Sequence, residues 1–169
     1  MMEKDLDYIL VNYYKPDMIA WLNTNPDFFD DAIQLALSNK QPYCWRAASL
    51  VWSCMIEDDP RVREYLSEIL TQLVSKNEGH IRELLRILLK MQLNETQEVL
   101  LFDQCINVWK NTKHSPSLRC VAFDFIEKMG MKYPDLTQEI LFHTESHYLH
   151  TLSPGIRRSI KLKITRLRK

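Results

Sequence analysis

Residues 43–56 read YCWRAASLVWSCMI, and this stretch decides which fold the sequence predicts. It is apolar almost all the way round a helix, and Arg46 is its single charged residue. A helix of this kind is normally buried on most of its sides. We therefore expect it to lie between neighbouring helices of an all-α protein.

The arginine of this stretch belongs to a pattern that recurs along the chain. In each copy an arginine follows an apolar or aromatic residue near the expected start of a helix. The four copies are Trp45-Arg46, Ile81-Arg82, Leu118-Arg119 and Ile156-Arg157. Their arginines are 36, 37 and 38 residues apart. Self-similarity at this period is typical of helical solenoids, in which helix pairs stack to bury their apolar faces.

The helix starts follow from capping residues and prolines. A side-chain oxygen at the N-cap accepts a free backbone N–H, and a proline in the next position has no N–H to leave unpaired. The clear cases are Asn25-Pro26, Asp59-Pro60, Ser115-Pro116 and Ser153-Pro154; Gln41-Pro42 and Tyr133-Pro134 are weaker, and Asn77 and Asn94 act without proline. They predict eight helices that begin near residues 26, 42, 60, 78, 95, 116, 134 and 154.

No glycine- or serine-rich linker interrupts this series, so the sequence predicts a single domain over residues 1–169. Residues 1–24 form an N-terminal helical segment, which we expect to break at Lys15-Pro16. Residues 25–169 form the repeats. The expected fold is a right-handed α-α superhelix of about four antiparallel helix pairs, with the last helix capping the array.

Composition excludes several classes of function. The chain has 22 basic and 22 acidic residues, whereas general nucleic-acid binders are usually basic. Its three glycines are too far apart for the common phosphate-binding loops. No apolar run approaches membrane-spanning length, and the acidic start does not fit a signal peptide. The four cysteines lack CxxC spacing, so we expect a cytoplasmic protein without a membrane partner.

Although the net charge is zero, the charges are unevenly distributed along the chain. Residues 1–31 carry seven acidic residues against two lysines, whereas no acidic residue follows Glu145. The last helix therefore has a basic surface. If the protein binds nucleic acid, we expect this helix to be the binding element.

The arginine followed by small apolar residues, as in Arg46-Ala47-Ala48 and Arg119-Cys120-Val121-Ala122, resembles the second helix of HEAT-type repeats. Over roughly residues 40–167 the chain is also similar to a group of small bacterial HEAT-like proteins. The segments that carry this similarity are residues 45–51, 117–122, 132–136 and 153–159. The resemblance implies a non-enzymatic protein-interaction or scaffold module, without a cofactor, whose second helices line a concave face.

The candidate binding residues are the repeated arginines, the cations near them and two tryptophans seven residues apart. They are Trp45, Trp52, Arg46, Arg82, Arg86, Arg119, Arg157, Arg158 and Lys161. In the binding interpretation, the arginines position an acidic or helical partner and the tryptophans anchor it. In the structural interpretation, each arginine satisfies a carboxylate or carbonyl in the turn before its helix, and the tryptophans belong to the core.

An enzymatic alternative comes from the same architecture. HEAT-like DNA glycosylases of the alkylation-repair type also place arginine and tryptophan on the concave side, so a base-binding function is the second hypothesis. We find no catalytic motif in the chain. His143 and His147 have the i, i+4 spacing that lets two imidazoles share a metal, and His150 follows nearby. The sequence leaves open whether this cluster binds metal, and we assign no metal site.

Overall fold

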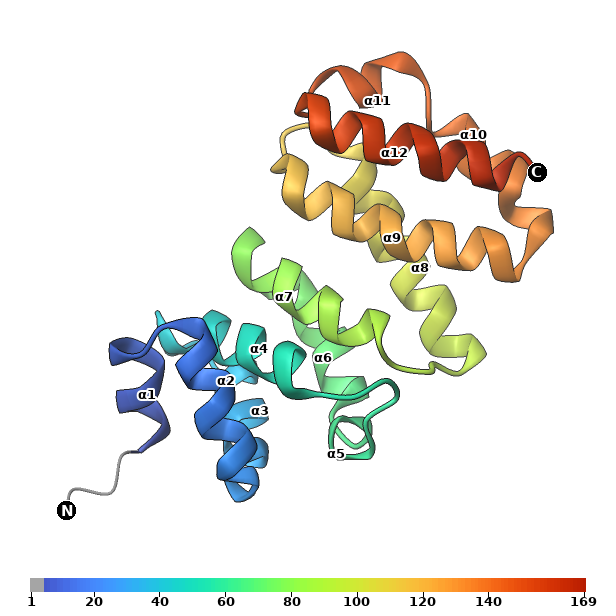
Figure 1. Ribbon diagram of the computed structural model, residues 1–169. Coiled ribbons are helices and arrows are strands. Elements are labelled where there is room, and N and C mark those ends of the chain that lie inside the picture. The colour runs from blue at the N-terminus through green and yellow to red at the C-terminus, as the bar shows by residue number, and fades with distance from the viewer. Residues whose placement is uncertain (1–4) are drawn as a thin grey trace. The chain divides into compact units, whose positions relative to one another are not determined.

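The computed structural model describes residues 5–169, and over these residues it contains helices and no strand (Figure 1). The all-α class predicted from the sequence is therefore confirmed. Within the described range, no helix is long and apolar enough to cross a membrane.

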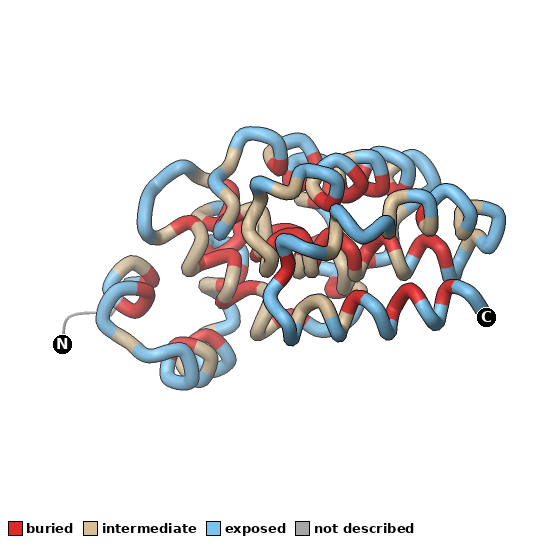
Figure 2. Tube along the Cα trace, turned by 90° about the horizontal axis from the view of Figure 1, so that it is seen from above, coloured by how far each residue is buried: buried red, intermediate tan, exposed pale blue. Residues whose placement is uncertain are grey.

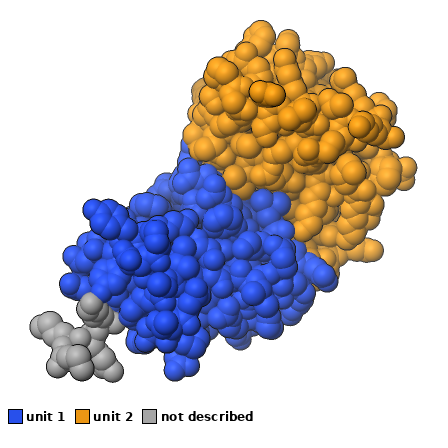
Figure 3. Space-filling view, in the orientation of Figure 1, with its two compact units in different colours: residues 1–92 blue, residues 93–169 orange. Residues whose placement is uncertain are grey.

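Contacts divide the chain into two compact units, Met1–Gln92 and Leu93–Lys169 (Figure 3). We describe each unit by itself, and the single domain expected from the sequence stays a prediction.

Unit 1 is built from seven α-helices and two 3₁₀ turns within its described residues. They are α1 (Leu6–Asn12), α2 (Lys15–Thr24), η1 (Pro26–Phe28), α3 (Phe29–Leu37), α4 (Tyr43–Cys54), α5 (Pro60–Arg63), α6 (Leu66–Gln72), η2 (Leu73–Ser75) and α7 (Glu78–Leu89). Helix α4 contacts α1, α2, α3 and α7. It buries Cys44, Ala47, Ala48, Leu50 and Val51. The expectation that this helix lies between neighbours is thus confirmed.

Unit 2 contains α8 (Glu95–Lys110), α9 (Pro116–Lys132), η3 (Pro134–Leu136), α10 (Thr137–Phe142), α11 (Ser146–His150) and α12 (Pro154–Leu167). Helix α9 is central and packs against α8, α10 and α12. Packing is close at Gly130, where an added Cβ would lie 2.7 Å from Leu167 Cδ2 and 2.8 Å from Ile140 Cδ1, so that the ends of these two side chains would have to shift. Figure 2 shows buried residues alternating with exposed ones along the helices.

Six of the eight predicted helix starts are confirmed to within one residue, and the N-terminal segment breaks before Lys15. At Pro26 and Pro134 a 3₁₀ turn begins instead, and α3 and α10 start three residues later. The capping mechanism holds only in part. Asp59, Asn77 and Asn94 accept backbone N–H groups with their side chains. Ser115 and Ser153 form no side-chain cap. Proline at the first helical position therefore accounts for the start of α9 and α12.

Two segments expected as single helices are interrupted. Residues 60–75 form α5, α6 and η2, and residues 134–150 form η3, α10 and α11. After α10 ends, the Thr144 hydroxyl donates to the Leu141 carbonyl at 2.7 Å, and Glu145 adopts an extended backbone. Such a local side-chain hydrogen bond competes with the helical pattern.

Candidate functional site

The two predicted tryptophans lie on one side of α4, together with Ser49. Trp45, Ser49 and Trp52 are three or four residues apart, so they follow one helix face. All three are half-buried. The tryptophans are therefore neither core residues nor fully exposed, and part of each ring remains available to a ligand.

Three cations surround the ring of Trp52. Lys15 Nζ from α2 lies 5.3 Å from its centroid, Arg86 Cζ from α7 lies 5.0 Å away, and Lys90 Nζ at the end of α7 lies 5.2 Å away. On the preceding turns of α4, Arg46 Cζ lies 5.7 Å from the centroid of the Trp45 ring. At these distances a ring attracts a cation through its quadrupole.

Three of these four cations, Lys15, Lys90 and Arg46, are held in place by neutral groups. Lys15 Nζ donates to Ser49 Oγ at 3.2 Å, and Lys90 Nζ donates to the carbonyl oxygens of Trp52 and Met55 at 3.0 and 3.2 Å. Arg46 Nη2 lies 3.5 Å from the Tyr13 carbonyl oxygen, and its buried Nε has no hydrogen-bond partner. Within residues 5–169, neither lysine nor Arg46 forms an ion pair, so their positive charge is not neutralised locally.

Arg82 and Arg86 share one carboxylate. Glu83 is 2 % exposed. Its Oε1 lies 2.9 Å from Arg82 Nη2, and its Oε2 lies 3.3 Å from Arg86 Nη1. One buried carboxylate therefore holds two guanidinium groups on this side of α7. Because it is held by both arginines, Glu83 is poorly placed to act as a general base.

A hollow of about 490 Å³ adjoins these residues in unit 1. Its walls come from the connection between α1 and α2, including Tyr13 and Tyr14, and from Trp45, Arg46 and Ser49 of α4. We use the name cationic face for the set that combines the tryptophans with the cations around them. The cationic face consists of Lys15, Trp45, Arg46, Ser49, Trp52, Arg86 and Lys90.

In unit 2 the repeated arginine has a structural role. Arg119 is 0 % exposed, so it cannot belong to a binding surface, and that part of the sequence-based site is corrected. It donates to the carbonyl oxygens of Trp109 and Tyr148 at 2.9 and 2.7 Å and to the Thr151 hydroxyl at 2.7 Å. Burial lowers the pKa of Arg119 below its ordinary value.

Arg157 completes the same arrangement. It donates to the carbonyl oxygens of Leu149, His150 and Leu152 at 3.1, 2.9 and 3.0 Å. Arg119 and Arg157 together therefore bind three successive carbonyls at the C-terminal end of α11. Cations are favourable at this end of a helix, whose last carbonyls have no partner within the helix.

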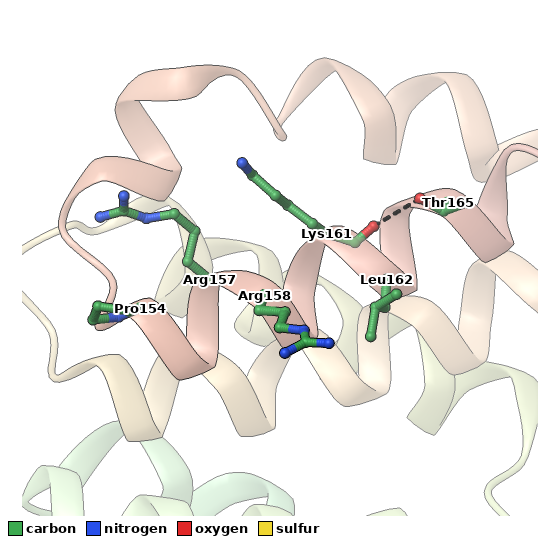
Figure 4. Close-up of a pocket in the computed structure, with 6 residues that line it drawn as sticks. All are labelled: Pro154, Arg157, Arg158, Lys161, Leu162 and Thr165. Carbon is green, nitrogen blue, oxygen red and sulfur yellow. Dashed lines mark hydrogen bonds between the residues drawn. The ribbon is translucent and has the colours of Figure 1, made fainter.

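The remaining predicted cations, Arg158 and Lys161, are exposed on α12 and form no ion pair within the described part of the chain. Figure 4 shows Arg157 and Lys161 extending to one side of α12 and Arg158 and Leu162 to the other. A shallow hollow of about 400 Å³ lies along this helix. Among the predicted cations, Arg46 and Arg86 are thus half-buried beside tryptophans in unit 1, and Arg158 and Lys161 form a separate exposed group on α12.

The structure separates the two histidines that have i, i+4 spacing. His143 follows the end of α10 and His147 belongs to α11, so the i, i+4 spacing does not place them on one helix. His147 Nδ1 instead lies 3.6 Å from Glu145. Across residues 5–169, no group of three or more histidine, cysteine, aspartate or glutamate side chains is arranged to hold a metal ion.

The sequence analysis missed a groove in unit 2 of about 600 Å³. It combines apolar side chains with carboxylates from α8, η3 and α10. The lining residues are Glu95, Glu98, Val99, Phe102, Asp103, Met129, Tyr133, Asp135, Leu136 and Glu139. We call it the acidic groove. The spacing Glu95, Val99, Asp103 along α8 was the signal that would have indicated its acidic edge.

Glu98 is the one buried carboxylate of the acidic groove. Burial would raise its pKa, but hydrogen bonds from Lys132 Nζ and the Tyr133 hydroxyl, both at 2.7 Å, outweigh burial and lower the pKa. Glu98 therefore ties the end of α9 to α8 and is not free to bind a ligand.

Comparisons with known proteins agree with this architecture. No curated protein and no solved structure matches the chain. The family described as HEAT repeat domain matches residues 3–166. Helical repeats of this kind act as protein-interaction or scaffold elements in general. The repeated arginines, the stacked helix pairs of each unit and this match over almost the whole length agree, and the chain belongs to the HEAT repeat family.

Proposed function

We propose that this protein is a non-enzymatic, cytoplasmic interaction module whose cationic face binds an acidic segment of a partner protein. The observation that carries the proposal is the environment of Trp52. Three cations lie about its half-buried ring, and two of them, Lys15 and Lys90, have no ion-pair partner within the described residues. A carboxylate placed there would gain charge-assisted hydrogen bonds in a partly desolvated position.

The tryptophans give the contact its anchor. Binding energy at interfaces is concentrated in a few aromatic and arginine residues near the centre of the contact. Trp45 and Trp52 are rigid because α4 packs on four neighbouring helices, so little side-chain entropy is lost on binding. The surrounding cations would then raise the association rate and select acidic sequences.

Single-stranded nucleic acid is the competing ligand, because it also combines negative charge with stacking groups. The chain has zero net charge, and residues 1–31 carry seven acidic residues against two lysines. A polyphosphate would be repelled by these neighbours, whereas a short acidic peptide segment would contact the cationic face alone. We therefore favour the peptide.

The test compares two probes of equal length. A fluorescently labelled amphipathic peptide of glutamate and leucine and a labelled oligothymidylate are each titrated with the full chain and followed by fluorescence anisotropy. Lys15→Glu with Lys90→Glu is expected to weaken peptide binding by at least about tenfold, or ~1.4 kcal/mol.

The matched control reverses the charge of two exposed lysines of unit 2, Lys110→Glu and Lys113→Glu, and should leave peptide binding unchanged. Circular dichroism checks that every variant folds. Tighter binding of oligothymidylate than of the peptide, lost in the same variant, would replace the proposed ligand by nucleic acid. Affinity capture from cytosol with the wild type and the Lys15→Glu/Lys90→Glu variant then identifies the natural partner.

A further inference from the structure

The acidic groove of unit 2 has an apolar floor between unpaired carboxylates. Glu95, Asp103, Asp135 and Glu139 are exposed, and none of them forms an ion pair within residues 5–169. Between them Val99 is 64 % exposed. An exposed apolar side chain in a hollow, rimmed by charges of one sign, is typical of a surface that another protein covers.

The charges of this groove have a regular spacing on α8. Glu95, Val99 and Asp103 follow one another at intervals of four residues, so they lie on one side of the helix. At about 1.5 Å per residue, the two carboxylates are ~12 Å apart along the helix axis. The edge of the groove therefore has the order acidic, apolar, acidic.

The outer side of α12 has the same spacing with the opposite charge. Arg158, Leu162 and Arg166 also follow one another at intervals of four residues, and Leu162 is 56 % exposed. Arg158 has no ion-pair partner in the described chain. Arg166 Nε contacts Glu127 at 2.7 Å while 54 % of its side chain remains exposed. This side of α12 has the order basic, apolar, basic over the same ~12 Å.

We infer that the acidic groove of one copy of this chain binds the outer side of α12 of a second copy. Leu162 enters the groove beside Val99 and Leu136, while Arg158 and Arg166 approach the carboxylates of Glu95 and Asp103. The apolar contact and both charge pairs can form simultaneously, because the three residues on α8 and the three residues on α12 have the same spacing. A second copy is the occupant that the structure supports, since its α12 matches the groove in sign, spacing and apolar centre.

Each copy carries both halves of this contact. A contact between unlike surfaces closes into a dimer or ring where the rotation between copies allows it, and otherwise continues as an open chain. One helix against one groove buries less than the ~1,200 Å² of a stable interface, so the association is weak and depends on salt. This inference does not rest on the proposed function, because it uses other residues in the other unit.

The experiment is sedimentation velocity of the full chain over a concentration series up to about 1 mM, at low and high salt. Screening shortens the range of charge interactions from ~10 Å at 0.1 M to ~3 Å at 1 M salt. Wild type is expected to self-associate at low salt and to lose this at high salt. Two variants, Arg158→Glu/Arg166→Glu on α12 and Glu95→Lys/Asp103→Lys in the groove, are each expected to be monomeric.

Mixing distinguishes a specific contact from general charge effects. An equimolar mixture of the α12 variant and the groove variant restores opposite charges across the contact. The unchanged α12 of the groove variant can bind the unchanged groove of the α12 variant, and the acidic α12 of the other copy can face the groove that has become basic. The mixture should therefore form a one-to-one complex although neither variant associates alone. Asp17→Lys/Asp31→Lys, which alters exposed acids of unit 1, is the matched control and should associate as wild type does.

Leu162→Asp tests the apolar part and should abolish association without a change in the circular dichroism spectrum. A monomeric wild type throughout the series, or variants that still associate, would overturn the inference. So would a monomeric wild type that binds a synthetic basic amphipathic peptide in the groove, since the occupant would then be another protein. Lys15→Glu/Lys90→Glu should associate normally, which separates this result from a failure of the proposed function.

Discussion

Both units contain an arginine over a tryptophan ring, but they use the pair differently. In unit 2, Arg119 Cζ lies 4.6 Å from the ring centroid of Trp109, and both residues are completely buried. In unit 1, Arg46 Cζ lies 5.7 Å from the Trp45 centroid, and both are half-buried. Arg46 and Arg119 are each the fourth residue of their helix.

The difference lies in what covers each arginine. Helix α11 and the turn after it lie over Arg119 and supply the Tyr148 carbonyl and the Thr151 hydroxyl. Within residues 5–169, the Arg46 guanidinium donates one hydrogen bond, to the Tyr13 carbonyl at 3.5 Å, and its buried Nε has no partner. The same sequence position is therefore structural where a neighbouring segment covers it and available for binding where it is open.

The largest expected effect is that of Arg119→Met. The change leaves buried carbonyls of Trp109 and Tyr148 without donors, and each unsatisfied group costs ~1–3 kcal/mol. We expect the free energy of unfolding, measured by urea titration, to fall by about 3–5 kcal/mol. A loss no larger than that of Arg46→Met would contradict the distinction between the two arginines.

Arg157→Met should have an intermediate effect. Arg157 donates to three carbonyls around the end of α11 but is only half-buried, so water replaces part of what is lost. We expect a loss of about 1–3 kcal/mol. Hydrogen exchange should show the amides of α11 losing protection before those of α9. Uniform loss across unit 2 would mean that Arg157 supports the whole unit rather than one helix end.

In unit 1, a buried histidine should make the free energy of unfolding depend on pH. Burial lowers the pKa of His80 in unit 1, where its Nε2 lies 2.6 Å from the Ala36 carbonyl oxygen. Because the unfolded chain binds this proton more readily, stability should decrease as the pH falls below the ordinary histidine value of about 6.5 and should level off below the folded pKa. The slope from this group is at most ~1.4 kcal/mol per pH unit.

His80→Gln should remove this contribution from the pH profile of urea unfolding, because glutamine can donate to Ala36 without titrating. His143, whose pKa is also lowered by burial, remains in that variant as the internal reference of unit 2. An unchanged profile would assign the pH dependence to His143 or to the carboxylates.

The smallest expected effect on stability is that of Arg46→Met. Its Nη2 contact is long and its ring contact is partly open to water, so we expect less than about 1 kcal/mol. The same variant should weaken binding of the acidic peptide severalfold, as fluorescence anisotropy would show. A large loss of stability with unchanged binding would place Arg46 with Arg119 among the structural arginines.

Much of the fold was predictable because its signals are local. Proline and a capping side chain act on the backbone within one turn, so the starts of α7, α8, α9 and α12 needed no tertiary information. The burial of α4 followed from its composition. The break between α10 and α11 was not predicted, because no proline or glycine marks it in residues 135–150 and the local hydrogen bond of Thr144 is visible only in the structure.

The candidate site was predictable only in outline. The tryptophan spacing correctly placed Trp45 and Trp52 on one helix face, but nothing local indicated that Lys15 and Lys90 would join them from α2 and α7. The acidic groove was missed for the same reason, because Asp103 and Asp135 come from different helices. Side-chain neighbours that are thirty or more residues apart depend on how helices pack.

The sequence by itself determined a helical repeat protein, with its helix starts and the position of each arginine within its helix, because capping and periodicity are short-range properties. Only the tertiary structure decided that Arg119 and Arg157 hold the end of α11 while Arg46 and Arg86 remain beside half-buried tryptophans. An arginine side chain bonds to whichever carbonyl or carboxylate packing brings within reach. For Arg119 that partner is Tyr148, twenty-nine residues away along the chain.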